Sequence, residues 1–157
     1  MPNGSSGHES AGADLLGTRL STATIMFHTA VADAQGLSVT DAKCRSLLLT
    51  HGRMTAGQLA ARLGLTTGAV TGVIDRLERA RLVRRAADPD DRRRVVVELV
   101  PDRKRARALE RLYQPMARRI YALVGGYSKK DQSTIAGFVA RASEILEEES
   151  ARLRKRR

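Results

Sequence analysis

Arginine side chains gather in one short stretch of the chain, and arginine is well suited to binding phosphate. The stretch contains Arg79, Arg81, Arg84, Arg85, Arg92, Arg93 and Arg94. A guanidinium keeps its charge at neutral pH and donates paired hydrogen bonds to phosphate or guanine. A genome rich in arginine codons, or an ordinary solvated face, would also supply arginines. Our interpretation therefore depends on the clustering of the arginines and not on their number. The clustering favours a polyanionic partner.

Other reactive side chains are not arranged for catalysis or metal binding. The sequence has no glycine-rich phosphate loop, no GxSxG and no metal motif. Asp88, Asp90 and Asp91 are expected on an exposed turn beside arginines, a poor place to raise a carboxylate pKa. The candidate metal ligands are Cys44, His28 and His51, but they lack the close sequence spacing of a metal-binding motif. We therefore expect a protein that is not an enzyme and that holds no metal or cofactor.

Length and composition narrow the class further. The chain has 157 residues, a net charge of +11, one cysteine and no tryptophan. A single cysteine excludes an internal disulfide, and 3% aromatic content argues against a single-strand binder with stacking platforms. We see no membrane-spanning run and no secretory signal in residues 1–12. We expect a soluble, cytoplasmic protein without a membrane partner, and nucleic acid is the leading candidate partner.

Apolar periodicity predicts the elements that position these arginines. After a disordered tail over residues 1–12, a 4-3 spacing predicts a helix over about 13–35. Five more helices are predicted: one that Ser38 or Thr40 caps and that ends near His51, one after Thr55, one over 66–79, one marked by Leu109 to Leu123 with a kink at Pro115, and one after Ser128. Residues 82–99 predict a β-hairpin, because Val95, Val97 and Leu99 alternate with other residues after a turn at 88–91.

Two short helices joined by a glycine turn and followed by a hairpin form a winged helix-turn-helix. In that arrangement the second helix can enter a major groove, and the hairpin tip can reach a minor groove, where arginine is favoured. Small and hydroxyl side chains at the start of the second helix would let the backbone approach a duplex and bond to it. These are Thr66, Thr67, Gly68 and Thr71.

Four stretches of this region are specific enough to suggest a family. They read TAGQLAARLGLTTGAVT over 55–71, IDRLE over 74–78, LVRR over 82–85 and DPDDRR over 88–93. Together they resemble the MarR family of winged-helix transcriptional regulators. The resemblance extends from about Phe27 to Leu99, and the flanking helices agree with the family in placement only.

The resemblance implies a homodimer whose N- and C-terminal helices interlock. Such a dimer binds a pseudo-palindromic operator in double-stranded DNA, often as a repressor, and small anionic or phenolic effectors or oxidation commonly release the DNA. By position, residues 66–79 would be the recognition helix, with Arg76 contacting a phosphate or base. Asp91 matches an aspartate that braces a wing arginine. Arg93 matches the arginine that enters the minor groove, with Arg92 as a second contact.

The resemblance also suggests an effector site. Phe27 and His28 fall where relatives form a ligand pocket, and Tyr113 could line the same pocket. Structural or core roles are the plainer interpretation of these residues. Cys44 does not match the sensor cysteine found in the first helix of some relatives, so we expect a buried, inert thiol.

Two positions depart from the family pattern. Arg81 stands where relatives usually have glycine after the recognition helix, and a left-handed conformation there would cost about 1 kcal/mol. The helix could instead end differently. After the hairpin, Leu99-Val100-Pro101-Asp102 replaces the usual Leu-Thr, so Asp102 is expected to cap the next helix.

The predicted fold is mainly α with a small β-hairpin wing. We predict a winged helix-turn-helix DNA-binding domain over 37–101 and a helical dimerisation domain formed by 13–36 and 102–157. The alternative is a winged-helix protein for assembly or nonspecific DNA architecture without a ligand switch. The spacing of Asp91 and Arg93, which fits a minor-groove probe, argues against that alternative.

Overall fold

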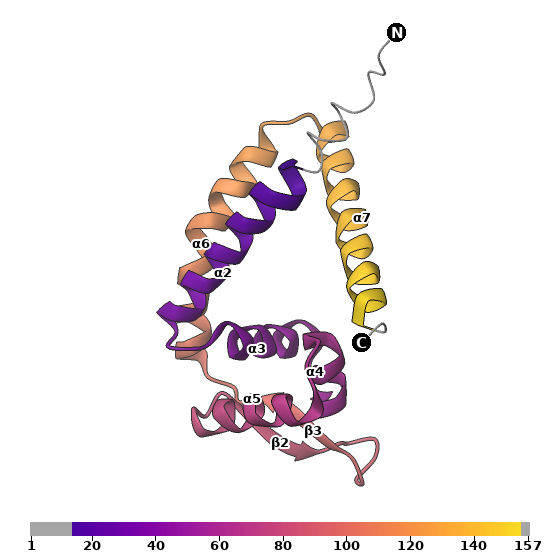
Figure 1. Ribbon diagram of the computed structural model, residues 1–157. Helices are drawn as coiled ribbons and strands as arrows, with labels where there is room; N and C mark the ends of the chain where they lie inside the picture. Colours follow the sequence, from indigo (N-terminus) through magenta and orange to yellow (C-terminus); the bar gives the residue numbers. More distant parts are fainter. Residues whose placement is uncertain (1–13, 155–157) are drawn as a thin grey trace. The chain divides into compact units, whose positions relative to one another are not determined.

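The computed structural model describes residues 14–154, which form helices and one small sheet (Figure 1). In chain order the elements are η1 (Asp14–Leu20), α2 (Ser21–Ala34), α3 (Val39–His51), β1 (Met54–Thr55), α4 (Ala56–Leu63), α5 (Thr67–Arg79), β2 (Val83–Ala87), β3 (Val95–Leu99), α6 (Arg103–Gly125) and α7 (Lys129–Arg154). The tail predicted over residues 1–12 lies outside the described residues. The mainly α fold with a wing is confirmed.

The first predicted helix is helical, but it is not one regular α-helix. Residues 14–20 wind as a π-helix, and the α-helix begins at Ser21. Gly17 lies in the π-helical part, and glycine supports an α-helix poorly. The helix ends at Ala34, just before the predicted stop at Gly36, which takes a left-handed conformation.

Local capping signals fix the other helix starts. Ser38 accepts a hydrogen bond from Asp41 N, which settles which of the two candidate residues caps α3. Thr55 caps α4 in a reciprocal capping box with Gln58, and Thr66 caps α5. Asp102 caps α6 as expected, by accepting from Arg105 N.

The sheet has one strand more than the predicted hairpin. Its order is β1-β3-β2, and β1 pairs antiparallel with β3 through Met54–Val97 and Thr55–Val96. A two-residue strand carries no alternating pattern, so periodicity could not reveal it. The alternation predicted for β3 is also wrong at Val95, which is exposed, while Val96 and Glu98 are buried beside Val97.

The core lies between α3, α4, α5 and the sheet. Figure 1 shows α3 and α5 stacked, with α4 at one end and the β2–β3 hairpin against α5. Seven side chains in this core are less than 2% exposed: Leu59, Ile74, Leu77, Val70, Val83, Val97 and Cys44. The winged helix therefore contains a packed interior of its own.

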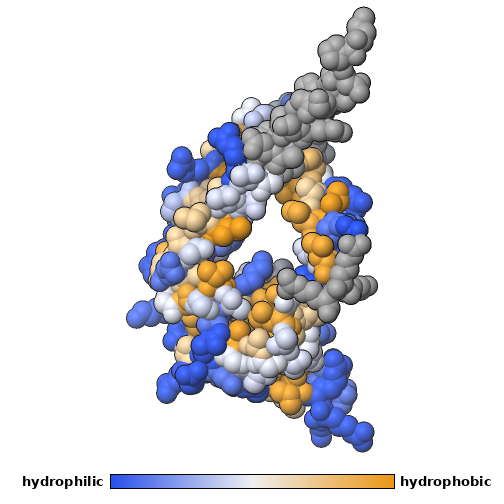
Figure 2. Space-filling model, in the orientation of Figure 1, coloured by the Kyte–Doolittle hydropathy of each residue, from blue (hydrophilic) through white to orange (hydrophobic). Residues whose placement is uncertain are grey.

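The chain divides into two compact units after Pro101. The second unit consists of α6, which continues through Pro115, and α7. Among the described residues, neither helix has a buried one. In the view of Figure 2, hydrophobic residues nevertheless gather along one side of α7 and hydrophilic ones along the other.

Within residues 14–154, no helix is both long and apolar enough to cross a membrane.

Candidate nucleic-acid interface

The helix-turn-helix is formed by α4 and α5. Gly64 takes the left-handed conformation that ends α4, and two residues later Thr66 begins α5. Four apolar residues of α5 are buried in the core: Val70, Val73, Ile74 and Leu77. Burial of this face leaves the opposite face of α5 exposed.

The exposed start of α5 contains the small and hydroxyl residues that the sequence singled out. Thr66 Oγ1 accepts from Ala69 N at 3.3 Å, and Thr71 Oγ1 donates to Thr67 O at 3.0 Å. A Cβ built on Gly68 would meet no atom within 4 Å. This end of the helix therefore has an open surface, although two of its hydroxyls already make hydrogen bonds within the helix.

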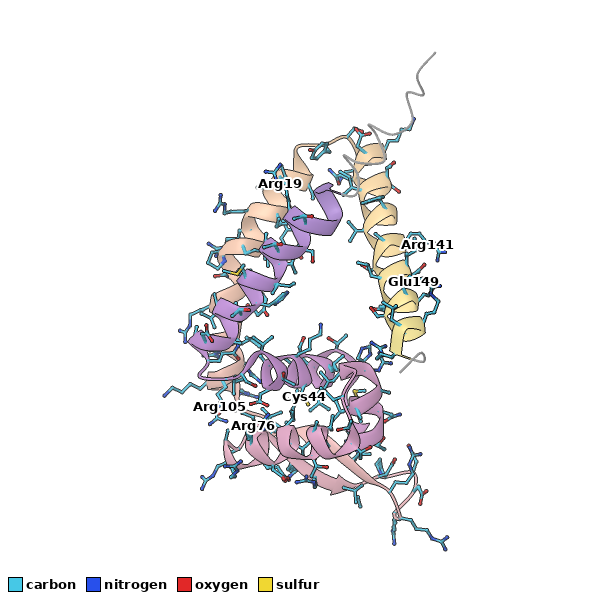
Figure 3. The ribbon with its side chains drawn as sticks, viewed as in Figure 1. Arg19, Cys44, Arg76, Arg105, Arg141 and Glu149 are labelled. Atoms are coloured by element: carbon cyan, nitrogen blue, oxygen red, sulfur yellow. The ribbon has the colours of Figure 1, made fainter. Side chains whose placement is uncertain are left out.

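Arg76 is bonded to another helix of the same unit. Its Nε and Nη2 donate to Asp41 Oδ2 and Oδ1 at 3.1 and 2.8 Å. Asp41 lies on α3, and its side chain is only 7% exposed, against 47% for Arg76. The hydrogen bonds and the negative charge of Asp41 raise the pKa of the Arg76 guanidinium. Figure 3 labels Arg76 together with Cys44 in the layer between α3 and α5.

A second arginine joins α5 to the wing. Arg85 on β2 forms ion pairs with Asp75 and Glu78 of α5, and its backbone N donates to Glu78 Oε1 at 2.9 Å. The hydrogen bond to Asp75, followed by the charges of the two acids, raises the pKa of Arg85. Because these bonds cross from strand to helix, they couple the direction of the wing to that of α5.

A row of three charged residues crosses the sheet. Glu98 on β3 pairs with Arg84 on β2 and with Arg53, which precedes β1, each at 2.6 Å. The hydrogen bond from Arg84, aided by Arg53, lowers the pKa of Glu98. Two cations thus satisfy one nearly buried carboxylate and bind the three strands together.

The wing tip is a closed turn. Asp88 N donates to Arg94 O, and Arg94 N donates to Asp91 O, both at 2.9 Å. The Asp91 carboxylate accepts from the backbone N of Arg93 at 3.0 Å. Within residues 14–154, no hydrogen bond or ion pair joins that carboxylate to the side chain of Arg93. Any brace from Asp91 to Arg93 in this structure therefore acts on the backbone. Arg92 and Arg93 are exposed.

Arg81 adopts the conformation for which the family usually has glycine. Its φ is 55°, and it is the one non-glycine residue with positive φ among residues 14–154. Leu82 N donates to Leu77 O at 2.9 Å, and Arg81 N donates to Glu78 O at 2.8 Å. This pair of bonds is the Schellman motif. The idea that the helix ends differently is therefore wrong: the turn is kept and an arginine occupies it.

The residues of the suggested effector pocket lie in two different units of the chain. The rings of Phe27 and His28 on α2 lie edge to face, with their centroids 5.7 Å apart. Tyr113 lies on α6, in the other unit. The effector pocket stays a prediction.

Cys44 is buried in the core, which agrees with an inert thiol. Burial, and to a smaller extent the charge of Asp41, raises its pKa to about 11. In residues 14–154 no group of three His, Cys, Asp or Glu side chains could hold a metal ion.

Asp41 and Glu98 also belong to this region, although the sequence does not single them out. Asp41 is an acid in the first turn of a helix, where acids are common, and Glu98 is one polar residue within a valine-rich strand. Each forms pairs only with residues distant in sequence, so no local signal could have identified its role.

Sequence comparisons with known proteins match the winged-helix region and most of the chain. The model of the MarR family matches residues 37–95. The chain is 42% identical over 137 residues to YcgE of Bacillus subtilis, described as an uncharacterized HTH-type transcriptional regulator, with 87% of this chain and 88% of YcgE covered.

Solved structures show the same fold. A MarR family protein from Bacillus stearothermophilus superposes with a TM-score of 0.69 at 18% identity, covering 93% of this chain and 99% of its own. A mutant of S. aureus MepR bound to an oligodeoxyribonucleotide superposes with a TM-score of 0.54 at 18% identity, covering 81% and 92%.

The fold and the site thus define a winged helix-turn-helix protein. The chain belongs to the MarR family of winged-helix transcriptional regulators.

Proposed function

We propose that this protein binds double-stranded DNA sequence-specifically as a homodimer and represses transcription from a pseudo-palindromic operator. The observation that supports this most is the link between the arginine-tipped hairpin and α5, a helix with one exposed face: Arg85 joins the wing to α5 through Asp75 and Glu78. A fixed angle between the two elements would let α5 enter a major groove while the wing reaches the adjoining minor groove. The DNA-bound state of the MepR relative supports the same use of the fold.

The proposed contacts divide between helix and wing. Thr66, Thr67, Gly68, Thr71 and Arg76 would approach the major groove and its phosphates. Arg93 would enter the minor groove with Arg92 beside it, while Asp91 holds the turn. The protein's net charge of +11 would make the affinity fall steeply with salt, because bound phosphates release counterions.

Helices outside the winged helix would form the dimer. We assign residues 13–36 and 102–157 to this role. The first range carries the 4-3 apolar spacing, and in the second, α6 and α7 have no buried residue in the part of the chain that the structure describes. Ile120, Leu146 and Leu153 are among their large exposed apolar side chains. A second copy would cover such side chains with two-fold symmetry.

Release by a small anionic or phenolic effector completes the proposal. We assign Phe27, His28 and Tyr113 to that site because of the resemblance to MarR relatives that form a ligand pocket in this region. No catalytic role is proposed.

The decisive experiment selects DNA fragments with the purified protein and footprints the best one. We expect a discrete two-fold site at about 0.15 M salt, with half-sites about one helical turn apart. Arg93→Ala should protect that site only at a higher protein concentration, whereas Arg141→Ala, which removes an arginine of α7, should protect it at the wild-type concentration. Equal affinity for selected and random duplexes would reject specific binding and leave nonspecific DNA architecture as the function.

The dimer is tested separately by sedimentation. Leu146→Glu should shift micromolar protein from dimer to monomer. Leu49→Glu makes the same change at an exposed leucine of α3 and should not. A wild-type monomer at every concentration would reject the homodimer.

A further inference from the structure

The ion pair between Asp41 and Arg76 uses only part of the guanidinium. Nε and Nη2 face the carboxylate. Arginine has five N–H donors, so Nη1 and one hydrogen of Nη2 remain. Among residues 14–154 we find no hydrogen bond that Nη1 donates. The Arg76 side chain is also nearly half exposed, so one edge of the group is held and the other faces outward.

The outward edge lies over a glycine of the same helix. A Cβ built on Gly72, one turn before Arg76, would lie 3.6 Å from Arg76 Nη1. That distance is an ordinary contact, so the guanidinium extends back along α5 toward the end that carries Gly68 and Thr71. Because Gly72 has no side chain, nothing from this position covers Nη1.

Asp41 itself cannot reach a ligand in solution, because its side chain is 7% exposed. Asp41 can influence a bound anion through its charge or through the groups that it touches. Loss of its negative charge would, by Coulomb's law alone, strengthen the binding of an anion. Its carboxylate accepts two hydrogen bonds from the Arg76 side chain. Weaker binding without this carboxylate would therefore identify Asp41 as a residue that orients Arg76.

We propose that the free edge of Arg76 binds one backbone phosphate of the DNA, that Asp41 is the positioning residue that presents this edge, and that Gly72 keeps the approach open. A guanidinium held on one side by a carboxylate loses little side-chain entropy when the other side meets a phosphate, and such pairing of planar groups is geometrically favourable. The proposal rests on the DNA-binding function proposed above. It adds an interaction that depends on three residues from two helices.

The test titrates four proteins against one selected operator over a series of salt concentrations: wild type, Asp41→Asn, Arg76→Gln and the double variant. We expect Arg76→Gln to weaken binding about tenfold or more, the scale expected when one charged group no longer meets the DNA. The slope of log K against log salt should become less negative by about 0.9 for each phosphate that the variant no longer binds. Asp41→Asn should weaken binding in the same direction, and it should have no further effect in the Arg76→Gln background.

Gly72→Leu separates binding from stability. Leucine supports a helix better than glycine, so urea unfolding should show unchanged or greater stability. Its side chain would cover Nη1, so the affinity should fall. Arg141→Gln, which removes an arginine paired with Glu144 on α7, is the matched charge control and should bind like wild type.

Several results would overturn the proposal. Unchanged affinity and salt slope in Arg76→Gln would show that Arg76 is only a tether between α3 and α5. Wild-type affinity in a folded Asp41→Asn protein would remove Asp41 as a positioning residue. If Asp41→Asn does not fold, Arg76→Lys replaces it: lysine keeps the charge but loses the paired geometry, and wild-type affinity in that variant would reject the proposal. Failure of the wild-type protein itself to select DNA would instead reject the proposed function.

Discussion

The winged helix and the pair α6–α7 were predicted from the same kind of apolar spacing, yet they differ in what that spacing buries. In the winged helix, residues such as Leu77 and Ile74 are within 1% of complete burial. In α6 and α7 the described residues include no buried one, and Leu146 is 68% exposed. An amphipathic pattern shows that a helix has an apolar face, but only the fold shows whether the same chain covers that face.

The largest expected effect is on stability, and it comes from making the same leucine-to-alanine substitution in each of the two regions. Leu77→Ala should lower the free energy of unfolding by about 2–5 kcal/mol, because it removes a fully buried side chain and leaves a cavity. It should not change the dimer–monomer equilibrium of the folded protein. Leu146→Ala should do the reverse. It should change the free energy of unfolding of the monomer by about 0.5 kcal/mol or less, and it should weaken dimerisation. Urea unfolding and sedimentation measure the two effects, and equal responses to both changes would mean that the regions share one core.

A smaller effect concerns the wing, which extends from the well-packed region into solvent. Arg93→Ala should weaken operator binding by about 1–3 kcal/mol. Asp91→Ala removes a negative charge near DNA, which by Coulomb's law alone would strengthen binding. Because Asp91 holds the turn through Arg93 N, we expect weaker binding, and no further loss in the Arg93→Ala background. Titration of the four proteins decides this, with circular dichroism to check folding. Tighter binding by Asp91→Ala would reduce Asp91 to a turn former.

A single substitution in the turn between α5 and the wing should make the protein more stable. Gly64 and Arg81 both end helices of the winged helix in the left-handed conformation, but only Arg81 has a side chain there. Arg81→Gly should raise the free energy of unfolding by about 1 kcal/mol, and Gly64→Ala should lower it by a similar amount. Denaturant unfolding of both variants gives the answer. A loss of stability in Arg81→Gly would mean that interactions of the arginine side chain outweigh its backbone strain.

The carboxylate of Glu98 should make the stability of the winged helix depend on pH. The two arginines hold the pKa of Glu98 below its ordinary value of 4.5. A lowered carboxylate pKa stabilises the fold above that ordinary value, and this stabilisation is lost as the pH falls through the lowered pKa. Glu98→Gln should therefore lower stability at pH 7 and flatten the decline below about pH 4.5. Urea midpoints from pH 7 to pH 3 test this, with Glu147→Gln on α7 as the control. Parallel pH curves for Glu98→Gln and wild type would contradict it.

Much of the fold was predictable because its signals are local. Thr55, Thr66 and Asp102 start helices through hydrogen bonds to residues three positions later, and Gly36 and Gly64 end them by adopting positive φ. The turn at 88–94 closes through its own aspartates. Each of these features depends on the identity of a residue and a few neighbours, so the sequence alone reveals it.

The proposed site was predictable as a set of positions but not as a set of bonds. The sequence placed Arg76 on the second helix of the helix-turn-helix and Asp91 two residues before Arg93. It could not show that Arg76 meets an acid 35 residues earlier, or that Asp91 bonds to the backbone of Arg93. The sequence also could not show the short strand β1 or the burial of Glu98, because both depend on which strands pair in the sheet.

The sequence by itself thus determined most of the helices and the hairpin, several helix caps, the family and the positions of the arginines. Propensity, capping and periodicity act over a few residues and leave a readable pattern. The tertiary structure alone decided the partners of Asp41, Glu98 and Arg85, and which apolar faces lie within a core. Those outcomes depend on distances between segments far apart in the chain, and such distances exist only after the helices and strands have packed.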